Sequence, residues 1–193
     1  MAESEATICS DALTLLRAQP ITALNEQNPR ALLCRQHYPN SRDEMLGRVP
    51  WREARKRVEL ALSATIPLFG WSAYFATPPD CIWVWRTSLD IEEGGDGSIN
   101  WAMENGFVAT TVSALKALYI YRLTDTKQFS SLLSKAITYD LAAKLAYPLT
   151  NSGAAQEQWA KERDQVIRTA GARNGSIGTK DRYKSTTLTR DVR

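Results

Sequence analysis

Apolar side chains recur every three to four residues along five stretches of the chain, which is the spacing of one face of an α-helix. Ser4, Asn28 and Asp125 precede three of these stretches and are residue types that cap helix N-termini. Pro29 follows Asn28 directly, at the first helical position, which proline favours. The pattern predicts helices over residues 6–18, 29–38, 41–64, 126–147 and 151–172.

Between the third and fourth of these predicted helices, apolar side chains recur every second residue, which is the spacing of one face of a strand. Residues 81–89 alternate in this way, and residues 116–122 form another strand-like run. Asn105-Gly106 separates two short apolar runs and is a strong signal for a tight hairpin turn. Four short strands in sequence predict an antiparallel β-meander over residues 81–122.

The end of the chain differs from the rest. Residues 175–193 are rich in Gly, Ser, Thr and basic side chains and contain few apolar ones, so alone they cannot bury enough surface to order themselves. Residues 168–193 carry seven basic and two acidic side chains, a net charge of +5, whereas the whole chain has +3. We expect a folded domain over residues 1–174 and an extended arm over 175–193 that meets an acidic partner, either a protein surface or nucleic acid. Because the arm mixes Ser, Thr and some apolar side chains with its basic ones, we favour a protein surface over nucleic acid as its partner.

The predicted fold class is therefore α+β: mainly a helical bundle, with an inserted antiparallel β-meander and an extended C-terminal arm. With 193 residues, 44% of them hydrophobic, the chain has the size of one domain. No apolar run approaches the roughly 20 residues that span a bilayer, and the first residues do not resemble a signal peptide. We expect a soluble protein made in a cytoplasm, without a membrane partner.

Candidate catalytic and metal-binding residues are few. Cys9, Cys34 and Cys81 lie far apart, and His37 is the single histidine, so a zinc site of Cys and His residues is not predicted. The acidic residues within 92–96 lack the ligand spacing of an EF-hand loop. No paired carboxylates stand out for general acid–base chemistry. We therefore predict no cofactor, no metal and no enzymatic activity.

The six tryptophans are interpreted as packing residues. Trp51 and Trp159 fall on the apolar faces of predicted helices. Trp83 and Trp85 share one face of a predicted strand, which favours packing of the sheet on a helix over a stacking platform for bases or sugars.

Read from end to end, residues 6–170 resemble one known family in the order and spacing of short segments. These segments are Pro20-Ile21-Thr22-Ala23-Leu24, Ala31 through Cys34 to Tyr38, Arg42-Asp43-Glu44-Met45-Leu46, Pro50-Trp51-Arg52-Glu53-Ala54-Arg55-Lys56-Arg57, Pro67 with Gly70-Trp71 and Tyr74, Pro79-Asp80-Cys81, Tyr121-Arg122-Leu123-Thr124-Asp125 with Phe129, Leu141-Ala142 to Leu145-Ala146, and Pro148-Leu149-Thr150. The chain resembles the head-to-tail adaptors of short-tailed bacteriophages, often called tail tubular protein A.

The resemblance implies a structural virion protein at the head–tail junction, made in the host bacterial cytoplasm. Such adaptors form a ring, usually of twelve copies, between the portal protein and the tail nozzle, near the tail fibres. The ring extends the channel through which genomic DNA passes without sequence-specific binding. In such a ring, we expect the aromatic loop Pro67–Pro79 and the strand face of Trp83 and Trp85 to contact a neighbouring copy.

We hypothesise that the arm docks on the portal. The residues expected to make this contact are Lys180, Arg182, Tyr183, Lys184, Leu188, Arg190 and Arg193. Two alternatives remain open at this point: a tail-associated peptidoglycan hydrolase, which requires a specific catalytic Glu or Asp, and a small DNA-binding protein acting through the basic arm.

Overall fold

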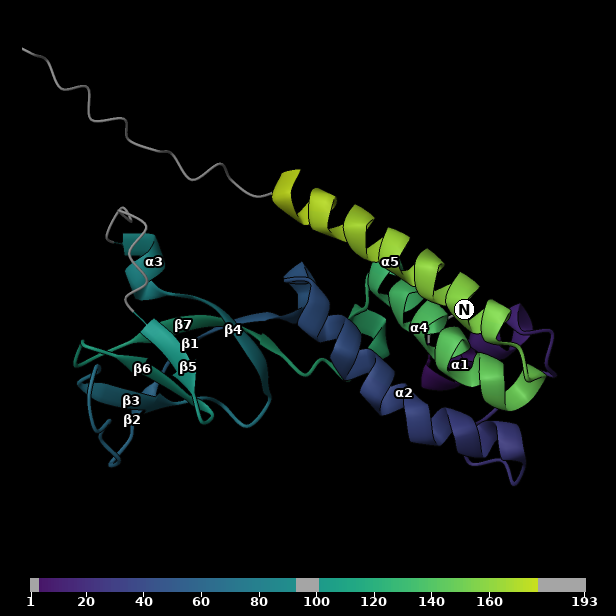
Figure 1. Ribbon diagram of the computed structural model, residues 1–193, viewed down its shortest axis with the longest axis horizontal. Coiled ribbons are helices and arrows are strands. Elements are labelled where there is room, and N and C mark those ends of the chain that lie inside the picture. Colours follow the sequence, from purple (N-terminus) through teal and green to yellow (C-terminus); the bar gives the residue numbers. More distant parts are fainter. Residues whose placement is uncertain (1–3, 93–100, 177–193) are drawn as a thin grey trace, which may run out of the picture.

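The computed structural model describes residues 4–92 and 101–176, which form a helical bundle on one side and two small sheets on the other (Figure 1). Both parts are present as expected, and the α+β fold class is confirmed. The arm predicted over 175–193 lies almost entirely outside the described residues.

Within the described residues four helices make the bundle, and a polar side chain caps the first turn of each; before the last helix, Ser152 Oγ accepts from the backbone N–H of Ala155 at 3.2 Å. Ser4, Asn28 and Ser130 accept hydrogen bonds from backbone N–H groups three residues further on, before α1, α2 and α4 respectively. Asn151 adopts a left-handed conformation, φ 52°, and ends α4. The helices are α1 (Glu5–Leu15), α2 (Pro29–Arg48), α4 (Ser131–Thr150) and α5 (Gly153–Ser176).

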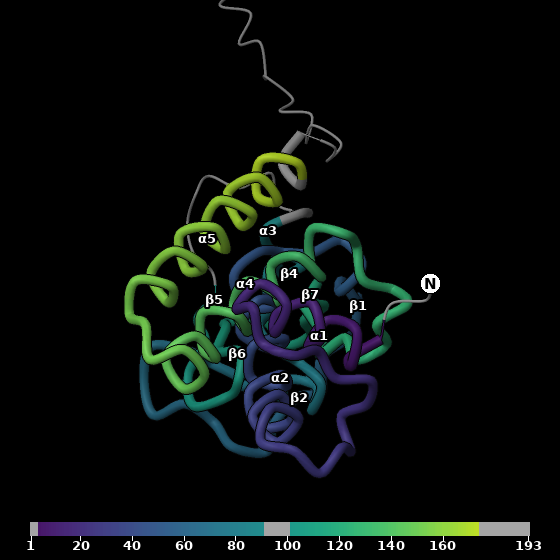
Figure 2. Tube along the Cα trace, turned by 90° about the vertical axis from the view of Figure 1, so that its right-hand side faces the viewer, coloured from purple at the N-terminus to yellow at the C-terminus, as the bar shows by residue number. Residues whose placement is uncertain are grey.

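Helix α4 is the centre of the bundle. Eleven of its residues are buried, on all sides of the helix, and it contacts α1, α2 and α5 (Figure 2). A helix that is apolar around most of its circumference belongs inside a domain. The main core of the protein therefore forms around α4.

In the part of the chain that the structure describes, seven strands form two antiparallel sheets. The first has the order β1 (Arg55–Glu59), β7 (Lys116–Tyr121), β4 (Cys81–Thr87), and the second has the order β2 (Ala61–Leu62), β3 (Ala73–Ala76), β6 (Phe107–Thr110), β5 (Trp101–Glu104). The short helix α3 (Ser88–Glu92) follows β4, and 3-10 turns cover Arg52–Ala54 (η1) and Thr126–Gln128 (η2).

Strand β7 contributes to both hydrophobic cores. Ile120 packs in the core of the bundle, whereas its neighbours Ala117 and Tyr119 pack in a second core between the two sheets, with Phe75 and Val108. The period of two along a strand sends alternate side chains to opposite faces. Strand β7, the central strand of the first sheet, therefore separates the two cores.

The structure corrects several predicted elements. The helix predicted over 41–64 is wrong beyond Arg48, because β1 and β2 occupy residues 55–59 and 61–62. The break predicted near Pro39 does not occur, and α2 runs through it. The strands predicted within 81–122 exist, but they do not form one consecutive meander, since β4 and β7 pair in one sheet and β5 and β6 in the other.

The continuous α2 has a simple explanation. Pro39 cannot donate to the carbonyl of residue 35, four residues earlier, but Arg35 and Pro39 are both exposed, so water can satisfy that carbonyl. Tyr38, Met45 and Leu46 are buried on the other side. Pro148 is likewise exposed and lies within α4, which continues past the end predicted at residue 147.

Candidate interaction surfaces

A network of charged side chains ties the bundle together. Asp140 on α4 is fully buried and receives Arg163 Nη1 from α5 at 2.9 Å and Lys144 Nζ at 2.7 Å. Lys144 Nζ also contacts Glu44 Oε2 on α2 at 2.9 Å. Although burial opposes it, the hydrogen bonds from Lys144 and Arg48 lower the pKa of Glu44. The buried Asp140 and its two cations thus join α4 to α5 and, through Glu44, to α2.

A second ion network joins the bundle to the first sheet. Asp43 on α2 accepts from Arg42 and, through its other oxygen at 2.8 Å, from Arg122 Nε just after β7. Trp83 on β4 donates from Nε1 to the carbonyl of Leu46, at 3.2 Å. These contacts fix the placement of the sheets on the helices.

The predicted packing role of Trp83 is confirmed by its contact with α2. Trp85 differs, because the strand is irregular between Val84 and Arg86, and its ring is instead flanked by Arg55 and Arg86. The pair Trp83 and Trp85 therefore does not form one shared apolar face.

The loop between β2 and β3 carries the most exposed apolar side chains of the described part of the chain. Leu68 is 99% exposed and Phe69 88%, with Ile66 at 70% and Leu62 at 61%. The twenty residues 60–79 contain no charged side chain. We call Ile66, Leu68 and Phe69, with Leu62 at the end of β2, the apolar loop; exposed apolar patches are typical of interaction sites.

Hydrogen bonds hold the base of this loop. Trp71 Nε1 and the Tyr74 hydroxyl donate to the two carboxylate oxygens of Glu104 on β5, at 3.1 and 2.8 Å. Gly70 has φ +80°, a left-handed conformation that glycine accepts without strain. The predicted aromatic loop Pro67–Pro79 is thus exposed through Leu68 and Phe69, while Trp71 and Tyr74 turn toward the sheet.

A basic surface covers the outer part of the first sheet. Two arginine side chains approach the indole of Trp85: the Arg55 guanidinium lies 4.1 Å and that of Arg86 4.9 Å from the ring centre. Arg55 also donates from Nε and Nη2 to the carbonyl of Pro50, at 3.1 and 2.7 Å. We call this surface the basic face and define it by Arg55 and Arg86 at the ring of Trp85, with Arg57 and Lys116 further along β1 and β7.

The electrostatics of the basic face are those of crowded cations. Burial and the like charges of neighbouring arginines, Arg52 first, then Arg86 and Arg57, lower the pKa of Arg55. Glu53 opposes this shift, but its carboxylate also accepts from the backbone N–H of Ser130. A protein surface that concentrates positive charge in this way attracts anions.

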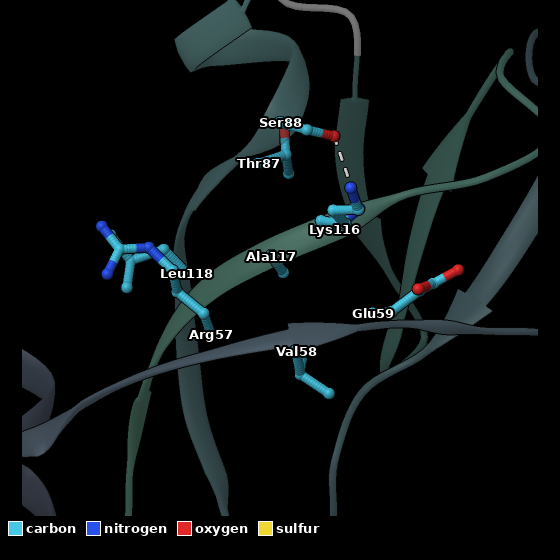
Figure 3. Close-up of a pocket in the computed structure, with 8 residues that line it drawn as sticks. All are labelled: Arg57, Val58, Glu59, Thr87, Ser88, Lys116, Ala117 and Leu118. Carbon is cyan, nitrogen blue, oxygen red and sulfur yellow. Dashed lines mark hydrogen bonds between the residues drawn. The ribbon is translucent and has the colours of Figure 1, made fainter.

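A pocket of about 410 Å³ borders the basic face (Figure 3). Arg57, Glu59 and Lys116 stand at its rim, and the Ser88 hydroxyl accepts from the backbone N–H of Lys116 at 3.4 Å. Leu118, which is 7% exposed, contributes to its apolar part. The pocket holds no cluster of titratable groups suited to acid–base chemistry.

The other candidate residues occupy structural positions. Cys9 and Cys34 are fully buried free thiols that form a hydrogen bond with each other, and this hydrogen bond and burial raise the pKa of Cys9. His37 lies half-buried on α2. Within the described residues 4–92 and 101–176, no group of three or more His, Cys, Asp or Glu side chains gathers to hold a metal ion.

The residues expected to bind the portal lie outside the described part of the chain; they are Lys180, Arg182, Tyr183, Lys184, Leu188, Arg190 and Arg193. The same holds for Glu93 and Asp96. Among the described helices, none has the length and apolar composition needed to cross a membrane.

Comparison with known proteins gives no further assignment. The chain matches no protein-family model, and no curated protein is similar to it.

Proposed function

We propose that this chain is a head-to-tail adaptor of a short-tailed bacteriophage, a structural subunit that forms a ring between the portal protein and the tail nozzle. The observation that carries the proposal is the apolar loop. In Figure 1 the loop between β2 and β3 lies at the bottom of the molecule, whereas α5 ends at the top. A subunit that joins two partners needs docking features on opposite sides.

The apolar loop supports a protein contact. Leu68 and Phe69 are almost fully exposed, on a loop whose base is hydrogen-bonded to Glu104, and neither belongs to either described core. Apolar side chains of this kind contribute favourable free energy when a partner removes them from water. We assign the loop to the nozzle side of the ring, in place of the contact with a neighbouring copy that the sequence led us to expect.

The C-terminal arm is assigned to the portal side. Helix α5 runs along the bundle and leads toward residues 177–193, whose basic and Leu side chains suit an acidic protein surface. The channel of the ring would admit genomic DNA without sequence-specific contacts, and tail fibres would attach near the nozzle.

Three of the segments that carry the family resemblance lie close together. Residues 42–46, 50–57 and 121–125 meet where α2, β1 and β7 adjoin, and they include the Asp43–Arg122 ion pair and the Trp83 contact at Leu46. These segments fix how the sheets sit on the bundle. A shared adaptor geometry requires this placement to be kept.

Sedimentation with purified partners tests the proposal. The chain alone is expected to sediment slowly, and to move into a fast, stoichiometric complex with the portal ring of the same phage. A chain ending at residue 174 keeps both cores and is expected to lose portal binding. Absence of any complex between folded full-length chain and portal would refute the adaptor assignment.

Recruitment of the nozzle protein tests the apolar loop. Leu68→Ser/Phe69→Ser is expected to bind portal normally and to fail in recruiting the nozzle to that complex. The matched control is Leu32→Ser/Tyr147→Ser, which removes two exposed apolar side chains from the bundle, 56% and 58% exposed. Equal nozzle recruitment by both double variants would contradict the role of the loop.

A further inference from the structure

The basic face has properties that the adaptor role does not use. We propose that it binds the phosphate backbone of nucleic acid, through guanidinium groups positioned by Trp85. This inference concerns residues of the sheets, not the arm, and it holds for the isolated chain whether or not the chain docks on a portal.

The first step is the positioning of two guanidinium groups. Arg55 and Arg86 are measured to the same ring centre, at 4.1 and 4.9 Å, so their guanidinium carbons are at most 9.0 Å apart. Cation–π contact with an indole holds such groups in place at a modest cost in solvation. Arg55 is further fixed by two hydrogen bonds to the Pro50 carbonyl, which leaves the other N–H donors of its fork for a ligand.

The second step is the repetition of charge along β1. Arg55 and Arg57 are two residues apart on one strand, so they lie on the same face at a separation of about 6.8 Å. Arg57 is exposed, and it pairs across the strands with Leu118 of β7, as Arg86 does from β4. Arg57 and Arg86 therefore lie in one row of the sheet, on either side of Leu118, and Arg55 lies in the next row.

The third step is the choice of ligand. Arginine forks match phosphate oxygens with two parallel hydrogen bonds, and four of the five cations in this region, with Arg52 included, are arginines. A protein partner would need apolar anchors, but Leu118 is 7% exposed and the ring of Trp85 is flanked by two guanidiniums. The face thus favours a phosphodiester backbone over an acidic protein.

The neighbouring pocket extends this surface. Arg57 and Lys116 border both the basic face and the 410 Å³ pocket (Figure 3). Glu59 at the same rim discourages deep entry of a phosphate, so we place the backbone across the arginines and not inside the pocket.

Salt-dependent binding of labelled duplex and single-stranded DNA to the full chain tests the proposal. Arg57→Gln/Arg86→Gln is expected to weaken binding at least tenfold at about 50 mM salt, and to reduce the slope of log K against log salt by ~0.9 for each phosphate contact that is lost. Arg35→Gln/Arg168→Gln removes the same charge from exposed helix positions and is expected to leave the slope unchanged. Equal losses in the two double variants would overturn the proposal.

A second variant separates positioned arginines from bulk charge. Trp85→Leu keeps the net charge and removes the ring between Arg55 and Arg86. Weaker DNA binding by a folded Trp85→Leu chain is expected; unchanged binding overturns the positioning role. Displacement of DNA by polyglutamate at equal charge concentration would overturn the choice of ligand and assign the face to an acidic protein.

These outcomes are distinct from those of the adaptor proposal. DNA binding is measured without portal or nozzle, and the Leu68→Ser/Phe69→Ser variant is expected to bind DNA as the unaltered chain does.

Discussion

The buried carboxylate of Asp140 offers a sharp test of how the bundle is held together. Asp140→Asn keeps the size of the side chain but removes its charge. The two cations that it neutralises, Arg163 and Lys144, are themselves 15% and 28% exposed, so water compensates them poorly. Removing one partner of a buried ion pair costs about 3–5 kcal/mol.

The low end of this range is expected here. Lys144 keeps Glu44, and Arg163 keeps Asp164 at 2.9 Å, so neither cation is left without a carboxylate. A loss of about 3 kcal/mol, at a urea dependence of about 2 kcal/mol per molar, lowers the midpoint of unfolding by about 1.5 M.

Urea unfolding followed by far-ultraviolet circular dichroism measures this shift. The control is Glu157→Gln, on the same helix as Arg163, which breaks the exposed pair of Glu157 with Lys161 and costs about 0.5 kcal/mol or less. A midpoint for Asp140→Asn within about 0.5 M of the unaltered chain, equivalent to ~1 kcal/mol, would show that the buried network does not stabilise the bundle as argued.

Three further predictions concern other parts of the chain. Trp51→Phe removes the 2.7 Å hydrogen bond to the buried Met45 carbonyl and is expected to cost about 1–3 kcal/mol in urea unfolding. Hydrogen bonds from Thr22 lower the pKa of Glu26 to about 2, so its stabilisation is present above the ordinary carboxyl pKa and lost as the pH falls through 2; melting temperatures of Glu26→Gln and the unaltered chain should converge there. Burial raises the pKa of Cys81 to about 11, so a thiol reagent at pH 8 should modify it slowly in the native chain and rapidly after unfolding.

The sequence predicted the helices of the bundle well where the apolar period and the cap agreed. Ser4 and Asn28 cap the helices that they were expected to start. Residues 51–64 misled the prediction because Ala54, Val58 and Leu62 are four residues apart, as in a helix, and the basic residues between them favour helices. The strand there depends on pairing with β7, about sixty residues later, which a local pattern does not reveal.

The interaction surfaces, too, depend on contacts between residues that are far apart in the sequence. The loop was predicted from its prolines and aromatic residues, but the side chains that project are Leu68 and Phe69, since Trp71 and Tyr74 bond to Glu104 on a distant strand. The basic face was missed because, on the helix predicted over 41–64, Arg55, Lys56 and Arg57 fall mostly on the side away from the apolar stripe and look like solvated residues. On a strand, Arg55 and Arg57 share a face and Lys56 points to the other, where it meets Asp80.

The position of β7 between the two cores has a consequence for how the protein can change. A slip of its pairing by one residue would exchange every side chain between the bundle and the sheets, placing Tyr119 against the helices and Ile120 between the sheets. A change in how β7 packs against the bundle therefore also changes how it packs between the sheets. The bundle and the sheets should melt together in a single calorimetric transition, and stabilising substitutions in either core should raise the temperature at which both are lost.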